Sequence, residues 1–385
     1  MRLYEPLSLA CQDDPYPVYR QLLDHWPLYR DDELNLWALS RFDDIVPVLR
    51  DWRTFSNAQG VNIENFVEIT GPEILNMDPP RHDLLRSVVH RAFAPAAIGK
   101  LEKSIAKQVD DLLRPLLNDG GGDLAVEFSQ RLPVLVIGDL LGIPRDELAH
   151  VQQATAAMLR REPGVSEIPA DALEAGAELR AYFENLCSER AVRPRGDIIS
   201  TLVGARPDGK PLPDEELVGM CVILYAAGNT TTNSLISNGL WILSKFPDQR
   251  AALARNPQAL PGAIEELLRF EAPVQYTSRV TTRDVELHGH VLQGGERVVL
   301  VLGAANRDGR RWTEPDKLDL FRPIIRNLAF GEGKHHCIGA PLARLEARLA
   351  FGAILRRAPE YAVTGPVERL YNSTERGLAR LTIRF

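Results

Sequence analysis

The sequence has only four cysteines, Cys11, Cys187, Cys221 and Cys337, and no two of them form a CxxC pair. This spacing excludes a disulfide framework and the paired ligands that are usual in structural zinc sites. Residues 1–10 lack a basic stretch followed by an apolar one, so we expect no signal peptide. No apolar run approaches the roughly 20 residues that cross a bilayer. The sequence therefore predicts a cytoplasmic protein that does not enter a membrane.

An excess of basic residues is also absent, because 45 Lys and Arg stand against 52 Asp and Glu. The net charge of -7 gives no reason to expect a nucleic-acid partner. Hydrophobic residues make up 45% of the chain, which is typical of a globular protein. The sequence contains no internal repeat, low-complexity run or long linker. We therefore expect a single domain over residues 1–385, present as a monomer.

Helical periodicity is the dominant pattern in the chain. Apolar residues recur at three- and four-residue spacing in residues 16–23, 43–50, 96–117, 132–141 and 171–190. A longer helix is expected from Asp214 to about Phe246, where Pro247 would stop it. Strand patterns are short and occur in residues 36–39, 285–291, 297–302 and 381–385, with a hairpin expected at residues 288–290. The sequence therefore predicts a mainly α protein with small β-sheets.

The segment FGEGKHHCIG, residues 330–339, is the most informative part of the sequence. A helix is expected from Gly339 to about Arg356, so Cys337 would lie at a helix amino terminus. The helix dipole lowers the pKa of a thiol at this position and favours metal binding. On the local chemistry alone, Cys337 is a structural cysteine, a haem ligand, or part of a zinc site. The zinc site would also use His335, His336 and one of His288 and His290.

This segment resembles the cysteine-loop signature of the cytochrome P-450 family, and every fixed position of that signature is filled. The resemblance implies that Cys337 is the metal ligand, a thiolate axial to a haem iron. It also implies that Phe330 packs near the cysteine and that His335 lies beside a haem propionate, with Gly331 and Gly339 in the haem-binding loop. The implied fold is the cytochrome P-450 fold, with haem b between the long central helix and the cysteine-loop helix.

A second segment, MDPPRH at residues 77–82, reads as a helix start. Asp78 would be its N-cap and Pro79 its first helical residue. The segment resembles the helix that runs over the haem edge in the same family. The resemblance implies that His82, Arg86 and, farther along the chain, Arg279 bind the haem propionates. Arginine suits this role because its guanidinium donates two hydrogen bonds to one carboxylate.

Glu266 and Arg269 are spaced one helical turn apart in residues 263–270. Taken alone, such a spacing indicates a surface ion pair worth a few tenths of a kcal/mol. The segment also resembles the ExxR helix of the family, in which an arginine before the cysteine loop completes the pair. Arg322 is the candidate for that arginine. The implied role is structural, because the pair would lock the haem-binding core.

The long helix carries AAGNTTT at residues 226–232, which resembles the oxygen-binding kink of the family. The resemblance implies that Thr231 is the oxygen-activating threonine, with Ala227, Gly228, Asn229 and Thr230 beside it. Thr230 departs from the family pattern, because an acid that helps to deliver protons usually stands there. Three outcomes stay open: a relay rewired through Thr230, Asn229 and water, slow or uncoupled oxygenation, and a chemistry that needs no such acid.

The resemblance implies a monooxygenase that inserts one oxygen atom from O2 into a hydrophobic small molecule. Electrons would come from a separate ferredoxin and ferredoxin reductase, since no residues remain for a reductase domain. The basic residues Arg91, Lys334 and Arg344 are candidate docking contacts. The alternatives are a peroxide-driven or nitric-oxide-reductase-like haem-thiolate enzyme, and a non-catalytic haem-binding protein. By family position, the expected pocket residues are Phe66, Ile69, Ala226, Val274, Gln275, Thr277 and Leu378.

Overall fold

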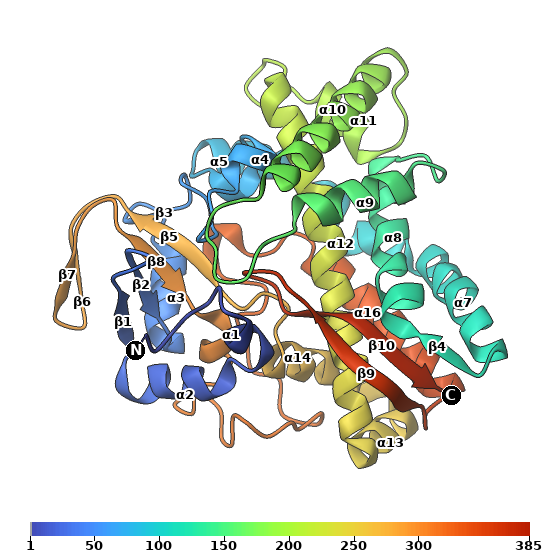
Figure 1. The fold of residues 1–385 in the computed structure, drawn as a ribbon. Helices are drawn as coiled ribbons and strands as arrows, with labels where there is room; N and C mark the ends of the chain where they lie inside the picture. The colour runs from blue at the N-terminus through green and yellow to red at the C-terminus, as the bar shows by residue number, and fades with distance from the viewer. Residues whose placement is uncertain (1) are drawn as a thin grey trace.

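The computed structural model describes residues 2–385 and shows a mainly helical protein with a region of small sheets at one side (Figure 1). The helix α12 (Asp214–Lys245) crosses the centre of the molecule. Three helices pack against it: α8 (Arg131–Leu141), α10 (Ala170–Val192) and α16 (Ala340–Arg357). Most residues of α12 are buried on all sides, which is the environment that an apolar helix requires. The prediction of a mainly α fold with small sheets is confirmed.

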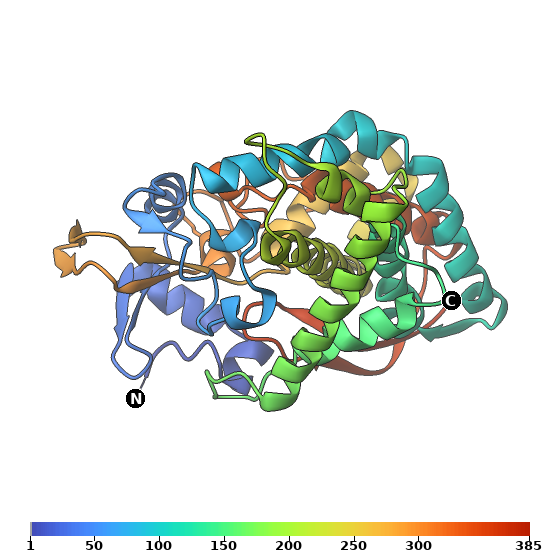
Figure 2. The same ribbon diagram turned by 90° about the horizontal axis from the view of Figure 1, so that it is seen from above.

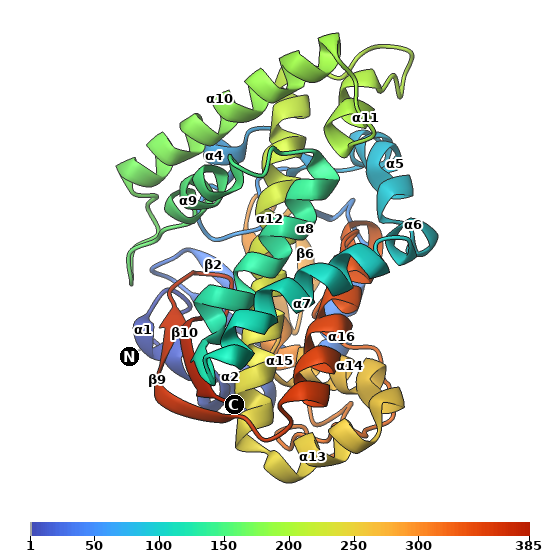
Figure 3. The ribbon, with the colours of Figure 1, turned by 90° about the vertical axis from the view of Figure 1, so that its right-hand side faces the viewer.

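The helices that cover α12 come from distant parts of the chain. Viewed from above, α10 passes over the end of α12, and α9 (Leu148–Met158) packs against α10 (Figure 2). From the side, α7 (Glu102–Asn118) lies across α8 and α16 (Figure 3). The remaining helices are α1 (Leu9–Asp13), α2 (Tyr16–His25), α3 (Phe42–Arg50), α4 (Val67–Thr70), α5 (Arg81–Phe93), α6 (Pro95–Gly99), α11 (Ile198–Gly204), α13 (Pro247–Arg255), α14 (Leu260–Phe270) and α15 (Leu302–Ala305).

The larger sheet has the strand order β1-β2-β8-β5-β3. Its strands are β1 (Leu28–Asp31), β2 (Leu36–Leu39), β8 (Arg297–Leu300), β5 (Thr277–Thr281) and β3 (Phe55–Ser56). Only β2 and β8 pair in parallel among these neighbours within residues 2–385. A second sheet joins β4 (Gly121–Asp123), β10 (Gly377–Arg384) and β9 (Ala362–Leu370). The hairpin of β6 (Val285–Leu287) and β7 (His290–Leu292) extends away from the body of the protein (Figure 1).

Two helix predictions are wrong at their boundaries. The single helix predicted for residues 96–117 is broken between α6 and α7, where the N–H groups of Lys100 and Leu101 form tighter hydrogen bonds to residues three positions earlier. Gly99 at the end of α6 favours this break, since glycine has little helix preference. Asp78 is not an N-cap, because α5 begins at Arg81. The Asp78 carboxylate instead accepts hydrogen bonds from the hydroxyl of Ser56 and the backbone N–H of Asn57.

The hairpin expected at residues 288–290, within the run 285–291, is confirmed: β6 and β7 pair through a turn in which His288 and Gly289 have positive φ angles. Another strand boundary differs from the prediction. The strand predicted for residues 297–302 ends at Leu300, and Leu302 already begins α15. No helix in the described part of the chain is both long and apolar enough to span a membrane.

Candidate functional site

A cavity of about 330 Å³ is enclosed by α12, the cysteine loop, the segment of residues 57–76 and the turn between β9 and β10. Apolar side chains such as Phe66, Leu224 and Leu235 form much of its wall. Cys337 lines this cavity together with Thr230 and Thr231 of α12. The fold therefore brings the cysteine loop and the long helix to one internal space.

Glycines shape the loop that presents Cys337. Gly331 and Gly333 have φ angles of 66° and 72°, a left-handed conformation that glycine adopts without strain. A Cβ atom on Gly333 would lie 2.6 Å from the carbonyl oxygen of Leu49 in α3, so no other residue fits this close approach. The N–H of Cys337 donates to the carbonyl of Phe330 (2.9 Å) and closes the loop. The backbone thus fixes where the thiol enters the cavity.

Burial raises the pKa of the Cys337 thiol above its ordinary value. The backbone N–H groups of Gly339 and Ala340 and the guanidinium of Arg86 act in the opposite direction. As predicted, the N–H groups at the helix amino terminus lower the pKa of the thiol, but burial raises it by more. A thiol in this balance becomes a thiolate when a metal ion stands beside it, since the ion's charge favours the ionised form.

The basic side chains that line the cavity include four that we call the basic group: His82 and Arg86 of α5, Arg279 of β5 and His335 of the cysteine loop. The imidazole rings of His82 and His335 lie 4.2 Å apart, centroid to centroid. Burial, reinforced by the charges of Arg279, His82 and Arg86, lowers the pKa of His335 to about 2. Burial likewise lowers the pKa of Arg279 to about 10. Positive charge on any one of the four groups therefore makes it less favourable to hold charge on the others.

Hydrogen bonding in this basic group is incomplete within residues 2–385. Nε2 of His82 and both ring nitrogens of His335 are buried without a partner. Arg86 donates to the carbonyl of His336 (2.7 Å) and Arg279 to the carbonyl of Ser278 (2.6 Å), although each guanidinium has five N–H donors. Buried polar groups and charges are stable only with partners. The two carboxylates of a haem would supply acceptors here, so the residues present fit that group.

The face of α12 toward the cavity carries Ala226, Ala227, Gly228, Thr230 and Thr231, followed by Thr232. The hydroxyls of Thr230 and Thr231 donate to the carbonyls of Ala226 (3.3 Å) and Ala227 (2.9 Å), four residues earlier. Such bonds bend a helix slightly, yet α12 stays helical through this region. Asn229 is buried and does not line the cavity, so of the three outcomes left open, a relay that includes Asn229 has no support in the structure.

Close packing of α12 on α8 requires a glycine at position 228. A Cβ atom at this position would lie 2.9 Å from Cγ1 of Ile137 in α8. The two helices can approach this closely because Gly228 has no side chain. The sequence suggested only a bend at this residue.

The carboxyl group of Glu375 is a cavity residue that the sequence analysis missed. Glu375 lies in the turn between β9 and β10, where its backbone forms a bridge with Val274. Its Oε1 atom accepts a hydrogen bond from the hydroxyl of Thr230 (2.9 Å). Burial raises the pKa of Glu375 to about 7, although the bond from Thr230 acts to lower it. No local motif marks Glu375, because its partner is 145 positions away in the sequence.

Four of the expected pocket residues line the cavity, namely Phe66, Ala226, Val274 and Thr277. The other three predictions are wrong. Ile69 packs on Gly176 of α10 instead, with its Cγ2 only 2.3 Å from where a Cβ of that glycine would lie. Gln275 is buried and donates to the carbonyl of Ala272 (2.6 Å), and Leu378 is buried in the core. Further lining residues that the sequence did not single out are Glu73, Arg161 and Glu375.

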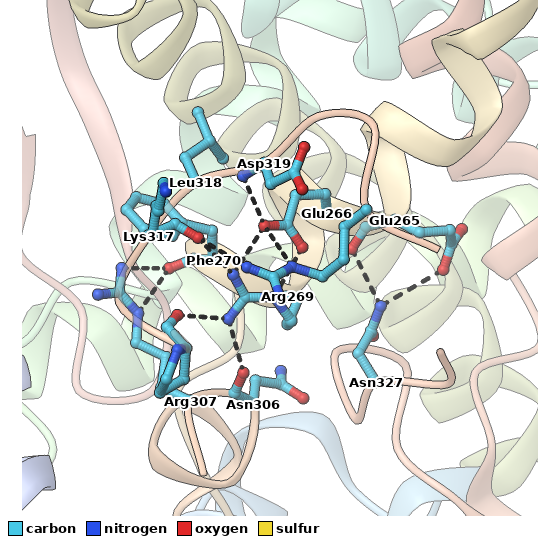
Figure 4. Close-up of polar contacts among 12 residues, drawn as sticks. Glu265, Glu266, Arg269, Phe270, Asn306, Arg307, Lys317, Leu318, Asp319 and Asn327 are labelled. Carbon is cyan, nitrogen blue, oxygen red and sulfur yellow. Dashed lines mark hydrogen bonds and ion pairs between the residues drawn. The ribbon is translucent and has the colours of Figure 1, made fainter. Parts of the chain in front are cut away.

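Glu266 and Arg269 form a buried pair in α14 (Figure 4). Nε and Nη2 of Arg269 donate to the two carboxylate oxygens of Glu266 over 2.7 and 2.8 Å. Nε of Arg322 donates to the same carboxylate (3.2 Å). Arg269 also donates to the backbone carbonyls of Asn306, Pro315 and Lys317. The surface interpretation of this pair is excluded, because Arg269 is 2% exposed and Glu266 4% exposed.

The remaining basic and histidine candidates lie outside the cavity or have acidic partners. His288 and His290 belong to the β6–β7 hairpin, and His288 contacts Asp44 (2.8 Å). No group of three His, Cys, Asp or Glu side chains within residues 2–385 is arranged to hold a metal ion, which removes the support for zinc. Lys334 pairs with Asp83 (2.7 Å) and Arg344 with Glu265 (2.6 Å). Of the three proposed docking contacts, Arg91 alone is exposed without an ion pair in the described chain.

The fold and the cavity define the class of helical proteins that hold a haem beside a cysteine thiolate, and comparisons with known proteins agree. The family model described as cytochrome P-450 matches residues 177–358. Cytochrome P-450 130 of Mycobacterium tuberculosis is 35% identical, over 91% of this chain and 89% of that protein. The chain belongs to the cytochrome P-450 family, and it is an enzyme of the monooxygenase class. Membership of this family implies a haem cofactor.

Solved structures share the whole fold. PksS, the cytochrome P-450 of the bacillaene polyketide synthase of Bacillus subtilis, superposes with a TM-score of 0.91 at 31% identity, over 99% of both chains. CYP109E1 of Bacillus megaterium, solved in complex with testosterone, superposes with a TM-score of 0.90 at 32% identity. That match covers 97% of this chain and 98% of CYP109E1.

Proposed function

We propose that Cys337 would supply the thiolate ligand to a haem b in this monooxygenase, and that the enzyme oxidises a hydrophobic small molecule with O2. The observation that carries the proposal is the single cavity that Cys337 shares with the basic group and with Thr230 and Thr231. When bound, the haem supplies the activation of O2 and the insertion of one oxygen atom into the substrate. The protein would act as a single domain over residues 1–385 and as a monomer.

The basic residues have the role of holding the haem carboxylates. Arg86 and Arg279 bring positive charge and spare N–H donors to the cavity. His82 and His335 are neutral at physiological pH because burial lowers both pKa values. A neutral imidazole donates one hydrogen bond, so each histidine would add a donor without a further charge.

Glu266, Arg269 and Arg322 act at a distance from the reacting atoms. Their ion pairs and backbone contacts hold the chain that leads to the cysteine loop. We assign them a structural role only.

Substrate binding is assigned to the apolar wall of the cavity and to a few polar groups. Phe66, Ile74 and Leu224 would exclude water from the substrate, and Tyr276 and Thr277 would orient a polar end. Because CYP109E1 was solved with testosterone, a steroid is a rational first compound to test.

Proton control is assigned to the threonines of α12. The Thr231 hydroxyl holds its proton in a bond to the Ala227 carbonyl (2.9 Å) at the cavity surface. An acid in contact with Thr230 favours O2-dependent chemistry over the peroxide-driven and nitric-oxide-reductase-like alternatives, which can dispense with such a group. Electrons would come from a separate ferredoxin and ferredoxin reductase.

The test is the carbon monoxide difference spectrum of the reduced holoenzyme. Wild type is expected to show the red-shifted Soret band of thiolate-ligated haem, and Cys337→Ser is expected to lose it. Cys11→Ser is the matched control, because Cys11 is a buried cysteine that lies outside the cavity. Loss of the band in both variants, or in neither, contradicts the assignment of Cys337.

A second measurement separates monooxygenase chemistry from its alternatives. Product formation from testosterone is compared in two reactions, one with NADH, ferredoxin, ferredoxin reductase and O2, and one with hydrogen peroxide alone. Product in the first reaction only supports the proposal. Product with peroxide alone would favour the peroxide-driven enzyme, and a haem protein without product or turnover in either reaction would favour a non-catalytic haem-binding protein.

A further inference from the structure

The long helix places a hydroxyl, Thr230, where an acid is usual in the family, and a distant carboxyl group reaches that hydroxyl. Glu375 lies in the turn between β9 and β10, whereas Thr230 lies in α12. Both residues line the cavity. The acid that α12 lacks is therefore present in the cavity on a different element.

The hydrogen bonds of Thr230 depend on the state of Glu375. The Thr230 hydroxyl has one proton and two acceptors in reach, Oε1 of Glu375 (2.9 Å) and the carbonyl of Ala226 (3.3 Å). When Glu375 is ionised, it can only accept, so Thr230 donates to it. When Glu375 is protonated, its O–H can donate to Thr230, and Thr230 then donates to Ala226. One proton on Glu375 thus reverses the direction of this chain of hydrogen bonds.

The surroundings of Glu375 keep both states accessible near neutral pH. Burial raises its pKa to about 7, and the bond from Thr230 is the opposing influence. No charged side chain among residues 2–385 contributes to this shift. The adjacent Arg376 pairs with Glu271 and donates to the backbone carbonyls of Gln12 and Asp13. Val274, which bridges to the Glu375 backbone, is apolar.

We propose that Glu375 supplies protons to the cavity through the hydroxyl of Thr230. The proposal rests on the proposed monooxygenase function. In the transfer, the O–H bond of the Glu375 carboxyl breaks as a new O–H bond forms on Oγ1 of Thr230. The original hydroxyl proton leaves the Ala226 carbonyl and passes to a water molecule in the cavity, which becomes a hydronium ion. Glu375 becomes a carboxylate and later takes a proton back from solvent water. No electron moves in this step.

The protonation of Glu375 can be measured directly in the holoenzyme by infrared difference spectroscopy between pH 5 and pH 9. Wild type is expected to show the stretching band of a buried protonated carboxyl that disappears with a midpoint near pH 7. Glu375→Gln is expected to lack that band. Glu73→Gln is the matched control, because Glu73 is a second buried cavity carboxyl with a raised pKa and without a contact to Thr230. Loss of the band in Glu73→Gln instead would overturn the proposal.

The role in proton transfer is tested in a reaction with ferredoxin, ferredoxin reductase, NADH and O2. The rates of NADH oxidation and of hydrogen peroxide release are measured. Glu375→Gln keeps the shape and hydrogen-bonding capacity of the side chain but cannot release a proton. It is expected to slow the proton-dependent rate by on the order of tenfold or more and to remove the change in rate near pH 7. Thr230→Val is expected to have the same effect, with little further loss in the double variant, because both changes interrupt one path.

A transplanted acid separates proton supply from a structural role. Thr230→Asp combined with Glu375→Gln returns a carboxyl to α12, and it is expected to recover a large part of the rate and coupling lost in Glu375→Gln. A structural role of Glu375 would not be rescued in this way. An unchanged pH profile in Glu375→Gln overturns the proposal, even if the KM for the substrate changes.

Failure of the proposed function would be seen separately. If the carbon monoxide spectrum shows no thiolate-ligated haem, the monooxygenase proposal fails, whatever the infrared titration gives. If that spectrum is normal and the band or the pH profile does not respond to Glu375→Gln, the inference about Glu375 alone is wrong.

Discussion

Arg269 binds Glu266 through two parallel N–H···O hydrogen bonds within one turn of α14, in a region that is closed to water. A lysine cannot reproduce this geometry, because it presents a single ammonium group instead of a planar fork. We expect Arg269→Lys to lower the free energy of unfolding by about 3 kcal/mol, since it weakens a buried pair and leaves carbonyls without donors. Urea unfolding of the holoenzyme measures the change.

A surface pair with the same spacing provides the control for this prediction. Arg114 and Asp111 are three residues apart in α7 and are exposed. Arg114→Lys is expected to change the free energy of unfolding by no more than about 0.5 kcal/mol. Equal effects at the two sites would contradict a special contribution from the Glu266–Arg269 pair.

Gly228→Ala tests the close packing of α12 on α8. Alanine is a better helix former than glycine by about 1 kcal/mol, yet its Cβ would lie 2.9 Å from Cγ1 of Ile137. We expect a net loss of about 1–3 kcal/mol in the free energy of unfolding, because the helices must move apart. Gly352→Ala in α16 is the control, since the nearest atom to a Cβ there is 3.6 Å away, and this variant should be neutral or more stable.

The same position allows a test by compensation. Ile137→Ala removes Cγ1 and Cδ1, the two atoms that a Cβ at Gly228 would meet most closely. The double variant Gly228→Ala/Ile137→Ala should therefore be more stable than the sum of the two single effects indicates. Strict additivity would show that the contact is not the cause.

Arg279→Gln tests whether the buried basic group holds the haem carboxylates. Hydrogen bonds to charged groups are worth about 1.5–3 kcal/mol, so a loss of about 2 kcal/mol corresponds to roughly 30-fold weaker haem binding. The rate of haem transfer to an apoprotein acceptor measures this loss. Arg283→Gln is the control, because Arg283 donates to Thr54 outside the cavity, and it should leave the transfer rate unchanged.

The raised pKa of Glu375 has a consequence for stability that follows from proton linkage. Its pKa rises from an ordinary value of 4.5 to about 7 on folding, so the folded protein binds this proton more tightly than the unfolded protein does. Protonation therefore protects the fold at low pH, and the cost of ionising Glu375 builds up as pH rises from 4.5 to about 7. Above that range the cost is on the order of 3 kcal/mol.

Glu375→Gln removes this cost, because glutamine does not ionise. The stability of the variant relative to wild type should therefore be higher at pH 8 than at pH 5, as measured by urea unfolding at both pH values. Glu368→Gln in β9 is the control, because the exposed Glu368 pairs only with Arg380, and its effect should stay within about 0.5 kcal/mol at each pH. A difference between Glu375→Gln and wild type that does not change with pH would contradict the raised pKa.

Structural features that depend on one continuous stretch of sequence could be predicted. The cysteine loop, with its glycines and Cys337, is a run of ten adjacent residues. The helical period of α12 is present over its whole length. The larger errors fall where the chain has no period. Ile69 lies in the one-turn helix α4, too short to show a period, and Gln275 lies in an irregular segment, so nothing local told which side either residue faces. Both were predicted to line the cavity, and neither does.

Glu375 illustrates a different limit. Its importance lies in a contact with Thr230 that exists only after β9 and β10 pair and bring their turn against α12. The sequence did indicate a gap, because Thr230 stands where an acid is usual. It gave no indication of which of the 52 acidic residues fills that gap.

The chain between α15 and α16 leads to Cys337 with little regular secondary structure. Arg269 donates hydrogen bonds to three backbone carbonyls of this stretch, those of Asn306, Pro315 and Lys317. Those contacts involve the backbone of this stretch and not its side chains. Side chains of the stretch also hold it, because Arg322 donates to Glu266 and Trp312 and Leu328 are buried. For protein engineering, only the exposed positions of this stretch are therefore exchangeable, while its course is held by these buried side chains together with Glu266 and Arg269. A graft that keeps this anchor should tolerate a new surface there, for example one redesigned to meet a different electron donor.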